Sequence, residues 1–303
     1  MIALLSAPTN LGLRPPQRGS VPGADKAPEA LREAGLFRRL LAGGARDAGV
    51  VLAGRYLDDD DVRPVGHVRN ETAMVDHARR LADRVVSILD AGDAPLVIGG
   101  DCSVLLGIGV ALARRGGVGL VHIDGHTDFR HPGNSEECAS VAGEDLAAAV
   151  GMHWPAIADI DGLAPYFDAR RVVHIGHRDD DEEAAETRGI LGRLISARDL
   201  REQTAENAAS ATAEIVGAGY WLQIDVDVLD PDIMPAVDSP DAGGVSASEL
   251  IELLARLAPG AVGASITVFD PDLDPDGRYA TLLAEIIATG LARLGAAYPS
   301  AIS

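Results

Sequence analysis

The sequence predicts an α/β protein in three layers, α/β/α, with a mainly parallel central sheet. Short apolar segments alternate with longer amphipathic segments from one end of the chain to the other, which is the pattern of βαβ units. Several of the short segments are too apolar for a sheet with one solvated face, as expected when helices cover both faces. No Pro/Ser-rich linker, internal repeat or break in composition interrupts this alternation. We therefore expect a single domain over residues 1–303.

The expected strands are short runs of β-branched and aliphatic residues. They cover residues 2–5, 50–52, 95–98, 119–123, 171–175, 220–224 and 261–268. The expected helices carry apolar residues at helical spacing, and they cover residues 27–41, 72–90, 103–115, 246–257 and 279–294. The polar stretches at 14–23, 130–140, 178–188 and 230–244 are expected to be loops. Three of these four loops begin where a strand ends, and that edge of an open α/β sheet is where ligands bind.

The chain is acidic, with a formal net charge of −20 and a pI near 4.6. Such a field repels nucleic acids and anionic membrane surfaces, so we expect neither as a partner. It would suit a cationic small-molecule substrate, although an acidic surface also serves solubility alone. The N-terminal segment lacks the features of a secretory signal, and the longest apolar run, residues 96–113, contains Asp101 and several glycines. We expect a cytoplasmic protein, whose two cysteines are too few for a disulfide framework.

The strongest chemical motif is Asp124-Gly125-His126-Thr127-Asp128, directly after the expected strand 119–123. In an extended segment, residues i, i+2 and i+4 point to one side, so Asp124, His126 and Asp128 would converge. Carboxylates this close repel each other strongly, and a divalent cation is the usual remedy. The motif therefore predicts metal ligands.

A second acidic motif follows the expected strand 220–224. Asp225 and Asp227 would share one side of the strand, and Asp230-Pro231 would end it as a turn. A single D-x-D is as readily a turn or a helix cap as a ligand pair. Two such motifs at the carboxyl ends of strands in one sheet, with a histidine between acids, favour a metal site. Oxygen and nitrogen ligands of this kind prefer Mn²⁺ or Mg²⁺ to copper.

A third element, Gly99-Gly100-Asp101-Cys102-Ser103, follows the expected strand 95–98 and opens a helix. The two glycines permit a tight strand-to-helix turn, and Asp101 or Ser103 can cap the helix. A helix N-terminus favours a thiolate. Cys102 is therefore a metal ligand, a covalent nucleophile or a small buried thiol.

Together these segments resemble the ureohydrolase family, which includes arginase, agmatinase, guanidinobutyrase and formiminoglutamase. The family's G-G-D-H-S, D-A-H-x-D and S-x-D-x-D-x-x-D-P motifs are similar to residues 99–103, 124–128 and 223–231, in the same order. Residues 8–12, 23–28 and 176–181 are similar to further family segments, so the resemblance covers nearly the whole chain. It implies an arginase-like fold and a metal-dependent hydrolase of C–N bonds in linear amidines, assembled as a homo-oligomer, a trimer or hexamer.

The resemblance also implies a ligand set for two divalent ions, with Mn²⁺ as the expected metal. One ion would be held by Cys102, Asp124, Asp128 and Asp225, and the other by Asp124, His126, Asp225 and Asp227. Asp124 and Asp225 would bridge the two ions. The ions would share a hydroxide that attacks the amidino carbon, while Asp128 orients it and relays its proton to the leaving amine.

Three departures from the family bear on the metal and the substrate. Cys102 stands where the family has histidine, and a soft thiolate shifts the preference towards Zn²⁺ or Fe²⁺ or weakens that site. Val268 stands where many members have an acid that binds the guanidinium, although Asp270 or Asp272 could compensate if their loop turns inward. Ala142 stands where arginases have a proton-shuttle histidine. We therefore expect a substrate other than simple arginine.

The loop after Asp128 carries further candidates. Arg130 could hold a substrate carboxylate bidentately, and His131 could take over proton transfer. Both are equally compatible with a solvated basic pair on an exposed loop. Asp181 ends the segment similar to the family's G-x-R-D-x-D, and we expect it to bind substrate together with Arg130 and Asp270.

Two other functions are compatible with the same residues. The apolar residues at Val268 and Ala142 would fit a homologue that binds metal without turnover. A single Zn²⁺ that cleaves an amide, as in the distantly related deacetylases, is the other alternative. Metal stoichiometry and a substrate panel would distinguish the three functions. The hydrolase should bind two ions and turn over an amidino substrate, the silent homologue should bind ions without turnover, and the amide hydrolase should bind one zinc and cleave an amide.

Overall fold

Eight parallel strands form one sheet in the order β2-β1-β3-β8-β7-β4-β5-β6. The structure is a computed structural model, and it describes residues 1–297. The strands are β1 (Ile2–Ala7), β2 (Arg46–Val50), β3 (Ala94–Gly99), β4 (Gly119–Ile123), β5 (Val172–Ile175), β6 (Arg193–Ile195), β7 (Tyr220–Asp225) and β8 (Ala261–Thr267). Because neighbouring strands are all parallel, their carboxyl ends lie along one edge of the sheet.

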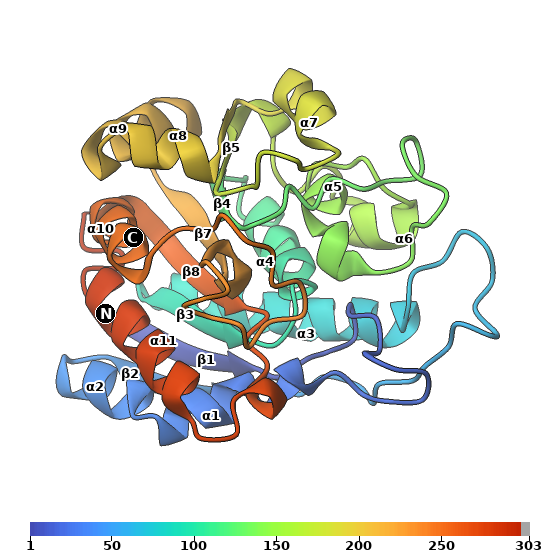
Figure 1. Cartoon of the computed structure of the whole chain (residues 1–303), viewed down its shortest axis with the longest axis horizontal. Coiled ribbons are helices and arrows are strands. Elements are labelled where there is room, and N and C mark those ends of the chain that lie inside the picture. The colour runs from blue at the N-terminus through green and yellow to red at the C-terminus, as the bar shows by residue number, and fades with distance from the viewer. Residues whose placement is uncertain (298–303) are drawn as a thin grey trace.

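Helices cover both faces of this sheet (Figure 1). One face carries α1 (Ala27–Glu33), α2 (Leu36–Ala42), α8 (Ala197–Glu202), α9 (Ala205–Val216), α10 (Ala247–Leu257) and α11 (Arg278–Gly290). The other face carries α3 (Glu71–Asp90), α4 (Val104–Ala113), α5 (Asp145–Ala149) and α6 (Pro155–Ala158). The remaining helix, α7 (Ala184–Ile190), packs beside the edge strand β6. The predicted three-layer α/β/α fold is confirmed.

Each central strand contributes to two hydrophobic cores. In β1, Leu4 packs into the core on the α1 face, whereas Leu5 packs into the core on the α3 face. In β3, Ile98 and Val97 alternate in the same way. A strand with helices on both sides needs apolar residues at successive positions, which explains the uniformly apolar segments in the sequence.

The predictions fail mainly at the edges of the sheet and in short helices. The strand expected at 50–52 is β2, Arg46–Val50, and β6 was not predicted. Edge strands bury only part of their surface, so their apolar signal is weak. The helix expected at 27–41 is broken at Gly35, whose φ of 88° is left-handed. Helices α5 to α9 were not predicted, and α7 begins inside the loop expected at 178–188.

The neighbouring strands β8, β7 and β4 end level with one another. Ile123 of β4 pairs with Ile224 of β7, and Asp225 of β7 pairs with Thr267 of β8. Residues that follow β4 and β7 therefore leave the sheet side by side. This register positions the site.

Candidate metal centre

Turns, and not extended strands, bring the acidic motifs together. The Asp124 carboxylate accepts from the His126 N–H at 2.7 Å, and the Asp225 carboxylate accepts from the Asp227 N–H at 2.9 Å. The chain thus bends immediately after each strand, and Asp128 has a left-handed φ of 47°. The expected convergence occurs, but the extended geometry from which we inferred it was wrong. An aspartate that accepts from the backbone two residues on is a common device for such turns.

The side chains form overlapping groups whose potential ligand atoms lie within 4.8 Å of one another. Three of these groups share Asp124, and two of them consist of predicted ligands alone: Cys102 with Asp124 and Asp225, and Asp124 with His126 and Asp227. Asp128 belongs to two further groups, described below. The structure therefore brings all six predicted ligand positions into one cluster.

Cys102 points into this cluster from the turn after β3. Its Sγ donates to Asp225 Oδ2 at 2.9 Å, and the Thr267 hydroxyl donates to the same oxygen at 3.2 Å. The tight turn requires Gly100, because a Cβ there would lie 1.7 Å from the Thr9 carbonyl oxygen. Burial and the surrounding carboxylates raise the pKa of the Cys102 thiol well above its ordinary value.

Asp101 holds the same turn. Its carboxylate accepts from the N–H groups of Gly12 and Ser103 at 2.9 and 2.8 Å. Asp101 therefore braces the turn before helix α4, and it does not cap the helix as the sequence suggested. The Ser103 side chain does not cap helix α4 either.

The electrostatics of the cluster call for a cation. Burial, followed by repulsion from neighbouring carboxylates, raises the pKa values of Asp124, Asp128 and Asp225 well above their usual range. His126 is different: although burial opposes it, the hydrogen bond from its ring to Asp227 raises the pKa of His126 to about 10. Without a bound ion, this contact favours a cationic imidazole beside Asp227. Divalent ions would neutralise the remaining carboxylates.

Buried polar atoms without hydrogen bonds also fit a metal site. Asp124 Oδ2, His122 Nε2 and both carboxylate oxygens of Asp145 are buried and make no hydrogen bond. Buried polar atoms are rarely left without a partner. The six predicted ligands are four carboxylates, one imidazole and one thiol, so the residues present fit divalent ions.

Asp145 and His122 are site residues that the sequence analysis missed. Asp145, at the start of α5, groups with Cys102 and Asp128, and His122 of β4 groups with Asp124 and Asp128. His122 Nε2 is 3.7 Å from a carboxylate oxygen of Asp145. For Asp145, the only signal in the sequence was its place directly before the apolar run 146–150. No spacing rule connects that acid to the motifs.

His126 and its supporting residues join the cluster to a distant loop. His126 Nδ1 is 2.9 Å from Asp227 Oδ2, and its Nε2 is 3.0 Å from Asp241 Oδ2. Asp241 lies outside the predicted ligand set, and an outer carboxylate of this kind orients a metal-binding imidazole. The buried Arg178 guanidinium donates to the carbonyl oxygens of Asp227 and Asp241, both at 2.8 Å. Arg178 therefore ties the segment after β7 to the segment that carries Asp241.

A cavity of about 570 Å³ opens above the cluster. Half of its lining residues are acidic: Asp128, Glu137, Asp180, Asp181, Glu182, Glu183, Asp225, Asp227, Asp238 and Asp241. Its cationic residues are Arg14, Arg130, Arg178 and, when protonated, His126. The Arg178 guanidinium donates its hydrogen bonds to backbone carbonyl oxygens, so Arg14 and Arg130 are the arginines of the cavity that could bind a ligand.

Of the remaining predicted site residues, Arg130 and Asp181 line the cavity. Arg130 lines the cavity, 3.9 Å from Glu183. Asp181 also lines it, but its carboxylate accepts from the Thr127 N–H and hydroxyl at 2.7 and 2.8 Å. The carboxylate of Asp181 therefore braces the 124–128 turn.

His131 and Asp270 are not among the residues that line the cavity. His131 Nε2 is 3.2 Å from Glu186, and its Nδ1 accepts from the Gly133 N–H. The Asp270 carboxylate accepts from the Gly23 N–H at 3.1 Å. Val268 does line the cavity, with a left-handed φ of 74° that β-branched residues normally avoid.

The fold and site are those of an α/β protein with a carboxylate-rich centre at the carboxyl edge of its sheet. The sequence profile of the arginase family matches residues 2–292. An arginase from Brevibacillus brevis is 28% identical over 285 residues, which cover 88% of this chain and 91% of that protein. A formimidoylglutamase from Aeromonas hydrophila is 30% identical over 307 residues, which cover 94% and 85% of the two chains.

The solved structure of an arginase from Bacillus caldovelox has a TM-score of 0.85 at 26% identity, covering 96% of this chain and 97% of that one. The chain belongs to the arginase family, the ureohydrolases, which are hydrolases that act on C–N bonds in amidino substrates. Within residues 1–297, no helix is both long and apolar enough to cross a membrane.

Proposed function

We propose that this chain hydrolyses a C–N bond in a small amidino compound that also carries a carboxylate, and that simple arginine is not its preferred substrate. One observation carries the proposal: residues of the potential ligand groups around Asp124 line a cavity whose wall also carries Arg14 and Arg130. The acidic wall suits a cationic amidinium, and the arginines suit a carboxylate.

The centre would hold two divalent ions. Cys102, Asp124, Asp128 and Asp225 would hold one, and Asp124, His126, Asp225 and Asp227 the other. Bound there, such ions would supply Lewis acidity and an activated water at neutral pH. Mn²⁺ is the metal we expect, with Zn²⁺ or Fe²⁺ favoured to the extent that Cys102 binds as a thiolate.

The residues of the chain then have separate tasks. Asp128 belongs to the cluster and also lines the cavity, which supports a role in which its carboxylate would orient the attacking water and pass a proton to the leaving amine. Arg130, half-buried at the cavity wall, would pair with the substrate carboxylate and fix the amidino carbon above the cluster. His131 faces Glu186, so a proton-transfer role for it requires the loop to rearrange.

Two features support a substrate other than arginine. The apolar Val268 faces the cavity and offers no partner to a guanidinium. The relatives also include a formimidoylglutamase and a guanidinopropionase, whose names denote other amidino substrates.

The test is a substrate panel with the Mn²⁺-loaded chain: guanidino and formimino carboxylates, the matching alkylguanidines without carboxylate, and arginine. We expect turnover of one carboxylate-bearing class above the alkylguanidines. Arg130→Ala should raise KM for that class by about tenfold or more and leave the alkylguanidines unchanged, because a charged hydrogen-bonded pair contributes roughly 1.5–3 kcal/mol. Arg18→Ala, an exposed arginine outside the cavity, is the control.

Asp227→Ala should abolish turnover, whereas Asp232→Ala, an exposed acid on the same loop that does not line the cavity, should not. Metal binding without turnover of any panel member would contradict the proposal and favour the silent homologue. One bound zinc with amide cleavage would contradict it in favour of amide hydrolysis.

A further inference from the structure

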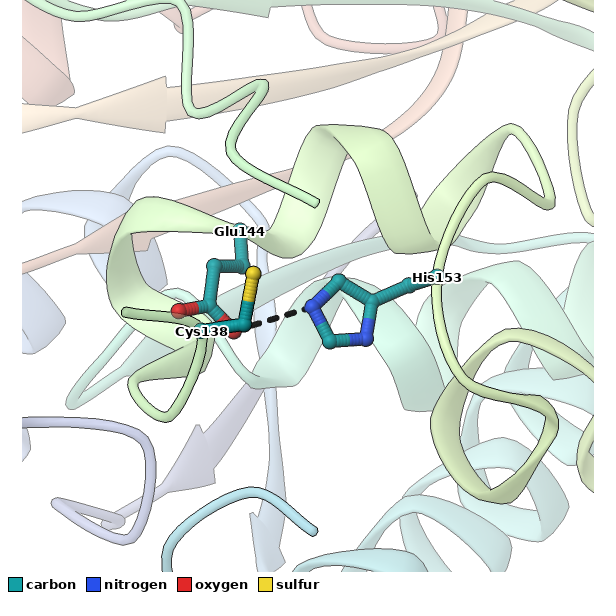
Figure 2. A group of neighbouring side chains, drawn as sticks. All are labelled: Cys138, Glu144 and His153. Atoms are coloured by element: carbon teal, nitrogen blue, oxygen red, sulfur yellow. Dashed lines mark ion pairs between the residues drawn. The ribbon is translucent and has the colours of Figure 1, made fainter. Parts of the chain in front are cut away.

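A second cluster of potential ligands lies outside the candidate metal centre. Cys138, Glu144 and His153 place a thiol, a carboxylate and an imidazole within 4.8 Å of one another (Figure 2). None of these three residues belongs to the groups around Asp124. They come from the loop before α5, the residue that precedes α5, and the segment between α5 and α6.

One carboxylate oxygen of Glu144 and one ring nitrogen of His153 are buried without hydrogen bonds. The side chains of Glu144 and His153 are fully buried, and Glu144 Oε2 lies 3.0 Å from His153 Nε2. Despite this distance, neither atom makes a hydrogen bond. The other carboxylate oxygen, Oε1, accepts from the N–H groups of Ala139 and Ser140 at 2.8 and 3.0 Å, which fixes the direction of Oε2. Two buried polar atoms thus face a shared point beside the Cys138 sulfur.

The donor set has the chemistry of a zinc site. Sulfur, nitrogen and carboxylate oxygen are the ligands that Zn²⁺ takes, and three protein ligands leave a fourth position for water. Without a cation, burial and the Glu144 charge raise the pKa of Cys138 to about 12. A bound cation would reverse that preference, because a coordinated thiol is deprotonated.

We propose that Cys138, Glu144 and His153 form a separate mononuclear Zn²⁺ site. The site fixes the wall of the cavity, because Glu137, Ser140 and Gly143, which are neighbours of its ligands in the chain, line that cavity. It also adjoins the main centre: Glu144 faces Cys138, while the next residue, Asp145, groups with Cys102. Loading of the zinc site therefore positions Asp145 as well as the cavity wall.

A proton shared by Glu144 and His153 is the competing account of the same contacts. The Trp154 N–H donates to His153 Nδ1 at 2.9 Å, so the neutral ring carries its proton on Nε2 in that state. Zn²⁺ at Nε2 would move the proton to Nδ1 and break this contact. The two accounts differ in what happens to the Cys138 thiol when zinc is offered.

The experiment compares alkylation of the metal-free full chain with and without added Zn²⁺, with each cysteine followed by peptide mapping. We expect Zn²⁺ to slow the modification of Cys138 by about tenfold or more, and a chelator to restore it. His153→Gln and Glu144→Gln should remove this protection. His67→Gln, which alters a His67–Glu71 pair that belongs to no group of potential ligands, should retain it.

Asp227→Ala separates the two centres, since it should lose metal at the main centre and keep the protection of Cys138. An unchanged alkylation rate of Cys138 in the wild-type chain would overturn the zinc site, as would protection that disappears in Asp227→Ala. If the buried variants fail to fold, Cys138→Ser provides the measurement. It should bind one Zn²⁺ fewer than the wild type by mass spectrometry, and an equal count would overturn the proposal.

Discussion

Cys102 Sγ donates to Asp225 Oδ2 at 2.9 Å, so the thiol occupies a place among the carboxylates of the main centre. The sequence left three roles for this residue. Its place in a group with Asp124 and Asp225 favours the role of a metal ligand. Burial also favours the neutral thiol when no cation is present, so metal binding and loss of the thiol proton are coupled.

Cys102→His should shift the metal preference of the centre towards Mn²⁺. Imidazole is a harder ligand than thiolate, so we expect the ratio of Mn²⁺ to Zn²⁺ affinities to rise by about tenfold or more. Competition between the two ions, followed by mass spectrometry of the bound metal, measures the ratio. Cys102→Ser is the control, because it removes sulfur without adding nitrogen. Equal ratios in all three chains would show that residue 102 does not bind the metal.

Asp145→Asn should weaken metal binding on the Cys102 side of the centre. Both oxygens of Asp145 are buried without hydrogen bonds and group with Cys102 and Asp128. Loss of the charge should lower the affinity for one ion by about 10–100-fold, as for other supporting groups at metal sites. Titration with Mn²⁺ measures this loss. Asp168→Asn, at an exposed 3-10 helix N-terminus, is the matched control, and equal affinities in both variants would contradict the assignment.

The acids within each motif were predictable because sequence neighbours converge on local turns. Asp124 with His126, and Asp225 with Asp227, lie two residues apart after apolar strands, so chain order alone revealed them. Asp145 and Asp241 could not be found in this way. They reach the centre through α5 and through the loop held by Arg178, and both placements depend on tertiary contacts.

The same distinction applies to the fold. Buried central strands such as β4 and β7 were predicted within one residue, because both of their faces are apolar. The edge strand β6 has only three residues, one of them exposed, and it escaped detection. Local turn geometry also mattered. The apolar periodicity predicted one helix at 27–41, but the left-handed Gly35 divides this segment into α1 and α2.

Val268→Glu should improve the hydrolysis of guanidines that lack a carboxylate. Val268 lines the cavity where an acid could pair with the guanidinium. A charged hydrogen bond contributes roughly 1.5–3 kcal/mol, so we expect kcat/KM for an alkylguanidine to rise by about tenfold or more. Val268→Gln, which has similar size but no charge, should give a smaller gain. Equal values for the two variants would show that position 268 does not contact the guanidinium.

The buried His77 should make the folded chain sensitive to mild acid. Its Nε2 lies 3.2 Å from the Val51 carbonyl oxygen, and burial lowers the pKa of His77 to about 4 from its ordinary 6.5. As the pH falls from 6.5 to 4, the unfolded chain binds a proton that the folded chain does not. The free energy of unfolding should therefore fall across this window, by up to roughly 3 kcal/mol.

Denaturant unfolding at pH 7 and pH 4.5 measures this loss, which should be smaller in His77→Gln because glutamine does not titrate. The comparison between the two chains removes the effects of other acidic groups. The same loss in both chains would show that His77 is not the group responsible.

The most direct test of the account is the metal content of the chain purified without added metal, and again after Mn²⁺ or Zn²⁺ is offered. Counting at the main centre is done in the Cys138→Ser background, so that the second cluster does not contribute. We expect about two ions per chain, with a lower count in Asp227→Ala. A chain that binds no stoichiometric metal under any of these conditions would contradict the central claim that this cluster is a binuclear hydrolase centre.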